Sequence, residues 1–255
     1  MAELDLRAVH LGFGGLKVLE GVAFVLEAGE LLALIGPNGA GKTSVLNCIC
    51  GIYRPTAGEV FFRGERITGE PPHAIAQRGI ARTFQHGELL PHLSVLDNLL
   101  VGRHTRLHAG FVSQALFLPS ARAAEQAQRE AVERILEFVE LERYRHQPVG
   151  TLGFGTQKIV GFARALALEP KVLLLDEPSA GLNREEREDL ARHILRIKHE
   201  LGMAMVWVEH DMQMVADLAD RLYVLNYGVP LASGAPETVL KDRRVIEAYL
   251  GAASA

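Results

Sequence analysis

The segment GPNGAGKTS, from Gly36 to Ser44, constrains the fold more than any other part of this sequence. It satisfies the pattern G-x-x-x-x-G-K-[ST], and it lies between an apolar run, LLALIG, and a stretch of helical character. Glycines let the backbone turn its N–H groups toward an anion, and the positive end of the next helix adds attraction. The pattern predicts a phosphate-binding loop between a buried strand and a helix. Its residues are Gly36, Pro37, Asn38, Gly39, Ala40, Gly41, Lys42, Thr43 and Ser44.

Two side chains of the loop have distinct predicted roles. Lys42 would reach the β- and γ-phosphates of a nucleotide, and Thr43 would place its hydroxyl on Mg²⁺. A second motif, KVLLLDEP, reads as a buried strand that ends in Asp176 and Glu177. Ligands of α/β sheets bind at the carboxyl ends of strands, so Asp176 is predicted to hold Mg²⁺ and Glu177 to polarise attacking water. A solvated turn is the alternative, and the upstream loop favours the catalytic role.

The order of hydrophobic patterns predicts an α/β protein with a helical insertion. The first 35 residues read as strands, AGEVFFRGERI as a hairpin, and the sequence becomes helical and amphipathic from about His86. Ala124, Ala131, Ile135 and Phe138 are predicted to form the apolar face of a helix there. Strands and helices then alternate again. We therefore predict one domain, 1–255, in which 1–85 and 159–255 form the core with a β subdomain, and 86–158 a helical subdomain.

The segment after the second motif predicts a helix with clear ends. Asn183 is the expected N-cap, Glu186 completes a capping box, and Gly202 is the expected stop. Leu190, Ile194, Ile197 and Leu201 keep helical spacing and form the expected apolar face.

Composition limits the possible partners. A net charge of −4 gives no general attraction to nucleic acid. The longest apolar runs fall far short of the ~20 residues that a membrane-spanning helix needs. A role at a membrane would therefore require a partner protein. Cys48 and Cys50 point to different sides of the predicted helix, and we interpret them as buried thiols rather than a disulfide or a metal site.

Four further features narrow the class of phosphate-loop protein. The N-K-x-D pattern of GTPases is absent from the sequence, which argues against that class. The four features are Gln85 in RTFQ, the stretch TLGFGTQK that opens a helix, the segment SAGLN, and His210 in VWVEHD. In this order the motifs resemble those of ATP-binding-cassette (ABC) ATPases. Within that superfamily the chain looks most similar to the ATP-binding subunits of branched-chain amino acid importers, on RTFQ, SVLDNLLVG, EPSAGLN, VEHDM and VIEAYLG.

This resemblance implies a P-loop NTPase (RecA-like) core with an antiparallel β subdomain and an inserted helical subdomain. It implies an ATP-hydrolysing subunit that uses ATP and Mg²⁺ to energise a membrane importer. Two such subunits, identical or of two kinds, would sandwich two ATP molecules. The expected partners are integral membrane permease subunits and, indirectly, an external substrate-binding protein, with no nucleic acid. The expected location is the cytoplasmic face of a bacterial-type inner or plasma membrane.

The resemblance also implies roles for individual residues. Phe13 would stack on adenine, with an ordinary packed aromatic as the alternative. Gln85 would contact Mg²⁺ and the attacking water, and His210 would bond the γ-phosphate and steady Glu177. The signature that contacts the ATP of the opposing subunit is Leu152, Gly153, Phe154, Gly155 and Thr156, and the D-loop is Ser179, Ala180, Gly181, Leu182 and Asn183.

The signature departs from the family's usual L-S-G-G-Q pattern. Gly153 stands where serine is usual, and Thr156 stands where glutamine is usual. One lost hydroxyl bond to a charged phosphate is worth roughly 1.5–3 kcal/mol, so we expect weaker hydrolysis at the site this signature completes. The alternative is an accepted variant with full activity.

Two other functions remain open at this point. The same subunit could serve an exporter, or it could be a cassette ATPase that acts away from membranes. RTFQHGELLPHLSVLDNLLVG and the AYLG ending favour the importer. Branched-chain amino acids, other hydrophobic amino acids and related small carboxylates are the expected substrates, and the sequence does not choose among them.

Overall fold

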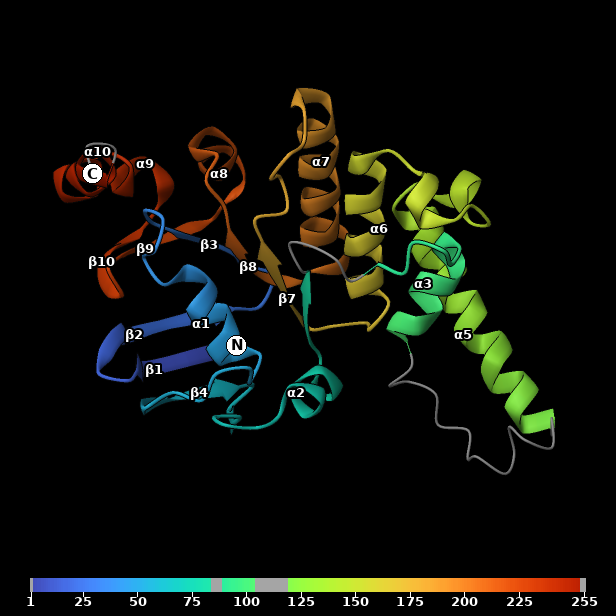
Figure 1. Ribbon diagram of the computed structural model, residues 1–255, viewed down its shortest axis with the longest axis horizontal. Coiled ribbons are helices and arrows are strands. Elements are labelled where there is room, and N and C mark those ends of the chain that lie inside the picture. Colours follow the sequence, from blue (N-terminus) through green and yellow to red (C-terminus); the bar gives the residue numbers. More distant parts are fainter. Residues whose placement is uncertain (1, 84–88, 104–118, 253–255) are drawn as a thin grey trace.

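The structure is a computed structural model that describes residues 2–83, 89–103 and 119–252, and its described strands form two sheets (Figure 1). The larger sheet has the strand order β10-β9-β3-β8-β7-β6. Its strands are β3 (Leu31–Ile35), β6 (Ile80–Thr83), β7 (Val172–Asp176), β8 (Ala204–Val208), β9 (Arg221–Asn226) and β10 (Val229–Gly234). All neighbours pair in parallel except β10, which runs antiparallel to β9.

The smaller sheet is antiparallel and is built mainly from the N-terminal segment. Its order is β2-β1-β4-β5, from β1 (Ala2–Phe13), β2 (Leu16–Glu27), β4 (Ala57–Phe62) and β5 (Glu65–Arg66). The helix α1 (Lys42–Ile49) lies between this sheet and the larger one in Figure 1. The two sheets confirm the predicted α/β class.

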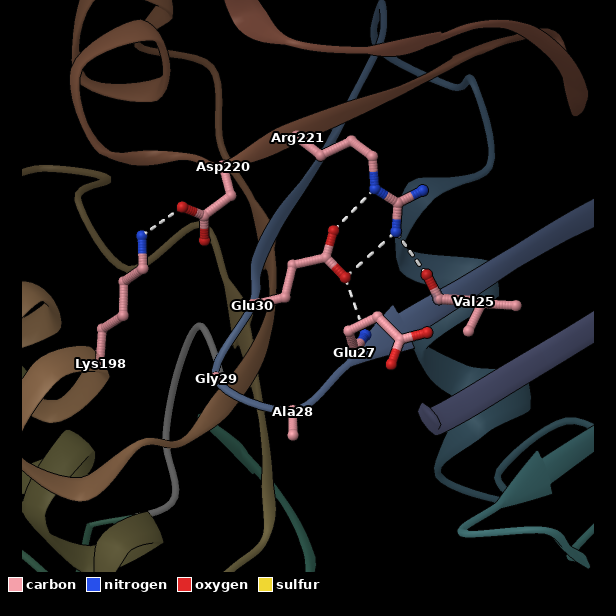
Figure 2. A pocket seen from close by; sticks show the side chains of 8 residues that line it. All are labelled: Val25, Glu27, Ala28, Gly29, Glu30, Lys198, Asp220 and Arg221. Atoms are coloured by element: carbon pink, nitrogen blue, oxygen red, sulfur yellow. Dashed lines mark hydrogen bonds and ion pairs between the residues drawn. The ribbon is translucent and has the colours of Figure 1, made fainter. Parts of the chain in front are cut away.

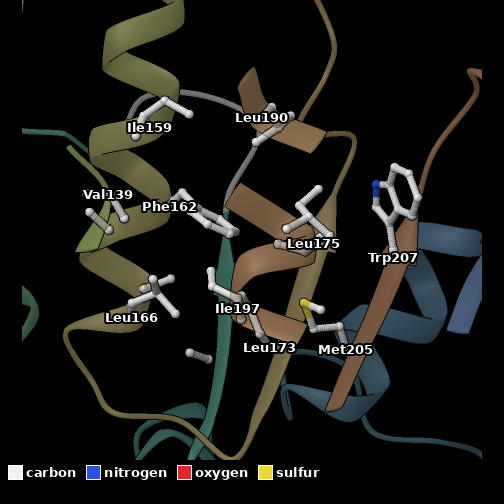
Figure 3. Packing of buried hydrophobic residues seen from close by; sticks show 14 of the residues in the cluster. Val139, Ile159, Phe162, Leu166, Leu173, Leu175, Leu190, Ile197, Met205 and Trp207 are labelled. Atoms are coloured by element: carbon white, nitrogen blue, oxygen red, sulfur yellow. The ribbon is translucent and has the colours of Figure 1, made fainter. Parts of the chain in front are cut away.

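The central strands are buried on both faces because apolar side chains alternate between two cores. Leu173 and Leu175 of β7 face one core, while Leu174 between them belongs to the other. The first core holds the side chains between the sheet and two helices, α6 (Phe154–Leu166) and α7 (Arg184–Leu201). Figure 3 shows Phe162, Leu166, Leu190 and Ile197 of these helices facing Leu173, Leu175, Met205 and Trp207 of the sheet. The second core joins the sheet to α1 and the antiparallel sheet.

The remaining helices flank this framework. Two of them, α3 (Val95–Gly102) and α5 (Pro119–Phe138), lie beyond α6 on the side away from the sheet (Figure 1). The others are α2 (Pro72–Arg78), α8 (Met212–Leu218), α9 (Pro236–Val239) and α10 (Arg243–Ala252), with short 3-10 turns at Glu142–Tyr144 and Val149–Thr151. The predicted boundary at residue 158 falls inside α6, and the subdomain division stays a prediction.

Two predicted helix faces differ in detail from the observed ones. In α5 the buried stripe is centred on Val132 and Leu136, whereas Ala124 and Phe138 are only partly buried. In α7 the face is confirmed for Leu190, Ile194 and Ile197, but the prediction for Leu201 was wrong, since it is 51% exposed. Leu201 is the last residue of α7, just before Gly202 turns the chain away in a left-handed conformation.

Candidate functional site

The phosphate loop joins β3 to α1, as the sequence predicts, and close packing fixes two of its glycines. A Cβ at Gly36 would lie 2.1 Å from the carbonyl oxygen of Leu225. Gly41, the N-cap of α1, has a φ of 97°, and its Cβ would lie 2.7 Å from Leu19 Cδ2. Residues with side chains rarely adopt that backbone conformation, so glycine is needed here even before a phosphate is considered.

Lys42 is buried at the start of α1, with 6% of its surface exposed. Its Nζ donates to the carbonyl oxygens of Gly36 at 2.8 Å and Pro37 at 3.0 Å. Burial lowers the pKa of Lys42, and the nearby carboxylates of Glu177 and Asp176 oppose that effect. The ammonium group therefore lies within the field of the predicted catalytic carboxylate, Glu177, and of the predicted metal-binding carboxylate, Asp176.

Asp176 ends β7 beside the end of β8, because Asp176 pairs in register with Val208. Its carboxylate is 2% exposed, and Oδ1 has no hydrogen-bond partner among the described residues. Thr43 and Ser44, in the first turn of α1, are not buried. A buried carboxylate oxygen that is free to accept a ligand, together with hydroxyls at the loop, fits the oxygen donors that Mg²⁺ prefers.

Glu177 and His210 meet directly. His210 Nε2 lies 2.6 Å from Glu177 Oε1, although the two residues follow different strands. Glu177 has a φ of 46°, and its N–H donates to the carbonyl oxygen of Val208 at 2.9 Å. Such a backbone conformation costs energy in a residue with a side chain and is often found at functional sites. The pair has the form of a general base that is held by an imidazole.

The predicted signature begins α6. Gly153 is its N-cap in an extended conformation, and a Cβ there would meet no described atom within 4 Å. Leu152 is buried, whereas Phe154 is half exposed, and Thr156 lies in the first turn. The N–H groups of a helix's first turn attract anions, and the predicted contact of this end of α6 with an opposing ATP stays a prediction.

Gly155 is in contact with the segment that follows the D-loop. A Cβ at Gly155 would lie 2.3 Å from Glu186 Oε1, and a Cβ at Gly181 would lie 2.9 Å from the ring of Phe154. Asn183 caps α7, and the capping box with Glu186 is confirmed. Of the other D-loop residues, Ser179 and Leu182 are buried and Ala180 is exposed. The predicted signature and D-loop therefore touch within one chain.

The remaining predicted site residues lie at the edges of this region or outside the description. Phe13, the last residue of β1, is 48% exposed, and its ring meets Tyr53 edge-on at a centroid distance of 5.1 Å. Its role in binding adenine stays a prediction. Gln85 falls outside the described residues, so its predicted contacts with Mg²⁺ and water also stay predictions.

Three polar residues near the site were missed by the sequence analysis. Arg82 on β6 is paired with Asp176, and its second contact is Asn47 on α1. Glu209 is 2% exposed, and its Oε1 accepts the N–H of His210 at 2.8 Å. A charged residue within the strand IART, close before Gln85, was the available signal for Arg82.

A separate open pocket lies at the turn between β2 and β3, at the amino ends of the parallel strands (Figure 2). Four of its charged side chains form two ion pairs: Arg221 Nε donates to Glu30 Oε1 at 2.6 Å, and Lys198 Nζ donates to Asp220 Oδ1 at 2.6 Å. The phosphate loop begins at the opposite, carboxyl end of β3. The pocket is therefore not part of the candidate site.

Comparison of the sequence with known families agrees with this geometry. A family model described as "ABC transporter" matches residues 19–180, and one described as "Branched-chain amino acid ATP-binding cassette transporter" matches residues 229–255. The chain is 39% identical over 250 residues to a high-affinity branched-chain amino acid transport ATP-binding protein, BraF, of Pseudomonas aeruginosa. It is 40% identical over 253 residues to the protein LivG of Escherichia coli K12, which has the same description. Each alignment covers 98% of both chains.

Solved structures give the same result for the fold. The crystal structure of the ADP conformation of an ATP-binding cassette of an ABC transporter matches with a TM-score of 0.86 and 32% identity. A nucleotide-free ATP-binding cassette from an ABC transporter matches with a TM-score of 0.85 and 31% identity. Both alignments cover 98% of this chain and 99% of the solved one.

Proposed function

This chain belongs to the ABC transporter family, and from that premise we propose that it is the subunit that hydrolyses ATP to drive uptake of branched-chain or other hydrophobic amino acids, or of related small carboxylates. The observation that carries the proposal is the contact of 2.6 Å between His210 Nε2 and Glu177 Oε1. This pair follows β8 and β7, at the same end of the sheet as the phosphate loop. It would polarise a water for attack on the γ-phosphate.

The chain's own residues divide the work of hydrolysis. Glu177 would accept a hydrogen bond from the attacking water and so polarise it, and His210 would keep that carboxylate in place. Lys42 would leave its two loop carbonyls to pair with the β- and γ-phosphates. Asp176 and Thr43, with Gln85, would hold Mg²⁺, which neutralises phosphate charge when it is bound.

The proposed partners follow from the same resemblance. Across the described residues, every helix is too short or too polar to span a bilayer. The subunit would act at the cytoplasmic face of a membrane through permease subunits, paired with a second cassette of the same or another kind. Closure of that pair on ATP would move the helical subdomains and switch the permease, and an external binding protein would supply the substrate.

The substrate class rests on the relatives and on the C-terminal segment. The two relatives are described as branched-chain amino acid transport proteins, and the family model for residues 229–255 bears a matching description. An uptake assay tests the proposal. Host cells in which this chain carries Glu177→Gln should lose most of their uptake of labelled leucine, isoleucine and valine. An excess of unlabelled phenylalanine or a small carboxylate in wild-type cells would define the substrate range. Unchanged uptake in the variant would contradict the proposed function.

A further inference from the structure

Arg82 places a fixed positive charge beside the carboxylate of Asp176, which is proposed to hold Mg²⁺. Its Nη2 donates to Asp176 Oδ2 at 2.5 Å, and the side chains of Arg82 and Asp176 are 7% and 2% exposed. A guanidinium keeps its proton at any pH at which proteins fold, so this charge is permanent. The proposed magnesium ligand therefore already has a cation as its partner.

The guanidinium is held from a second side. Its Nη1 donates to Asn47 Oδ1 at 2.6 Å, on the helix that begins at the phosphate loop. Arg82 thus joins β6, β7 and α1 around Asp176. Because both ends of its fork are bonded in a buried place, withdrawal from Asp176 would also break a bond to α1 or leave a buried charge unpaired.

Two cations act near Asp176 without a metal ion. Arg82 is paired with its carboxylate, and Asp176 and Glu177 both act on the pKa of Lys42. A divalent cation that approaches Asp176 would meet a carboxylate whose negative charge is already paired with the positive charge of Arg82. At short range and low local dielectric, repulsion between Arg82 and Mg²⁺ would be substantial.

We propose that Arg82 is a counter-cation that competes with Mg²⁺ for Asp176, and that it keeps the affinity of the nucleotide site for the metal low. This inference rests on the proposed function, because it takes Asp176 as the metal-binding carboxylate. Arg82 donates to one carboxylate oxygen of Asp176, Oδ2, and leaves the other, Oδ1, for the metal or for a water bound to it. A weak hold on Mg²⁺ favours release of the magnesium–ADP product, which each round of hydrolysis requires.

The test measures metal binding rather than hydrolysis. Binding of a fluorescent ADP analogue to the purified full chain is measured while free Mg²⁺ is raised from zero. The quantity recorded is the Mg²⁺ concentration that gives half of the total change in binding. Arg82→Gln keeps hydrogen-bonding ability but removes the charge, so this concentration should fall by about threefold or more. Arg82→Lys keeps the charge and should stay close to the wild type. If Arg82 served packing alone, both variants would bind less well and would need more Mg²⁺, whereas the proposal expects Arg82→Gln to need less.

A matched control is provided by Arg103, which is also buried and bonded in its own cluster. Its Nη1 donates to Glu169 Oε1 at 2.8 Å and to the carbonyl oxygen of Ala167 at 2.9 Å. Arg103→Gln removes a buried charge elsewhere and should leave the Mg²⁺ dependence unchanged.

Asn47→Ala supplies a second variant if Arg82→Gln does not fold. It frees one end of the guanidinium, so the Mg²⁺ concentration should move in the same direction by a smaller factor. The proposal is overturned if Arg82→Gln or Asn47→Ala leaves the Mg²⁺ dependence unchanged or weakens binding. It is also overturned if Arg82→Lys behaves like Arg82→Gln. A wild-type chain that binds no nucleotide at all would instead overturn the proposed function, so the two failures are distinguishable.

Discussion

At the scale of single residues, Gly155 shows that a motif residue has a role inside its own chain. The family resemblance places this glycine in the signature, which would contact the ATP of an opposing subunit. The structure adds a contact within the chain, since a Cβ at Gly155 would lie 2.3 Å from Glu186 Oε1. Glu186 is not free to move aside without loss, because its Oε2 accepts the N–H of Asn183 at 2.9 Å. Glycine at this position therefore also lets the first turn of α6 approach the capping box of α7.

This contact predicts how Gly155→Ala changes stability. Alanine in a helix is ordinarily more stable than glycine by roughly 0.5–1 kcal/mol, and here we expect the clash with Glu186 to cancel or reverse that gain. In a background that carries Glu186→Ala, the same change should stabilise the protein by about 0.5 kcal/mol. Urea unfolding of the four proteins in this cycle measures the coupling. Equal effects of Gly155→Ala in both backgrounds would contradict the steric explanation.

The two cysteines lead to a second prediction at this scale. Burial raises the pKa of the Cys48 thiol to about 12 and that of Cys50 to about 11, and both thiols are free. The thiolate is the reactive form, and a raised pKa leaves about one thousandth of Cys50 ionised at pH 8. We therefore expect iodoacetamide to modify the native chain very slowly at pH 8 and faster as the pH rises toward 10. The same chain in urea is the control and should react fully, and rapid modification of the native chain at pH 8 would contradict the prediction.

At the scale of elements, α7 is defined by its ends. The side chain of Asn183 accepts the N–H of Glu186, and the carboxylate of Glu186 accepts the N–H of Asn183, so two of the backbone donors at this end are satisfied. The same element supplies Leu190, Ile194 and Ile197 to the core beside the central sheet. The first turn of α7 thus links core packing to the D-loop that precedes it.

The cap predicts a measurable loss of stability. Asn183→Ala should lower the free energy of unfolding by about 1 kcal/mol, because the N–H of Glu186 loses its acceptor. Arg184→Ala is the matched control, since Arg184 is the next residue and its side chain is 93% exposed. It should change stability by less than about 0.5 kcal/mol. Chemical unfolding of both variants checks the difference, and equal losses would rule out the capping explanation.

The elements also show which features a single sequence can predict. The buried strands β3, β7 and β8 and the helix α7 were predictable, because continuous apolar runs and capping residues mark them directly. The helix α2 and strand β6 were not, since each is short and β6 carries Arg82 in a run of only four residues. The Glu177–His210 pair could be expected from motif order, but its contact depends on the register of β7 against β8. The Arg82–Asp176 pair depends on which strands are neighbours, and local patterns do not encode that.

At the scale of the whole molecule, the parallel sheet gathers the predicted catalytic and metal-binding groups at one end. The phosphate loop, the Asp176–Glu177 pair and His210 come from three separate parts of the sequence, yet each lies at or just after the carboxyl end of β3, β7 or β8. The signature at the start of α6 stands apart from this set, because Gly153 has open space around it among the described residues. A single chain therefore presents its predicted catalytic groups and its predicted signature as separate regions, an arrangement that would suit the proposed pairing of two subunits.

The last prediction concerns this open terminus. Gly153 already has the extended conformation that serine adopts as an N-cap, and its Cβ would meet no described atom within 4 Å. Gly153→Ser should therefore enter without strain and restore a hydroxyl near an opposing phosphate. The ATPase rate of the chain assembled with its permeases should rise by up to about tenfold, the equivalent of about 1.4 kcal/mol. Gly161→Ser is the matched control, because Gly161 also has open space but lies further along α6.

Combining Gly153→Ser with Glu177→Gln separates two ways of pairing. In the proposed dimer the added hydroxyl would act on the site of the opposing subunit, whereas the loss of Glu177 would act on the chain's own site. If the opposing subunit is a different cassette, its hydrolysis still benefits from the serine, and the double variant should exceed Glu177→Gln alone. If two copies of this chain pair, both sites lack the base, and the gain should disappear. An equal gain from Gly153→Ser and Gly161→Ser would show that the hydroxyl acts through helix stability and not across the dimer.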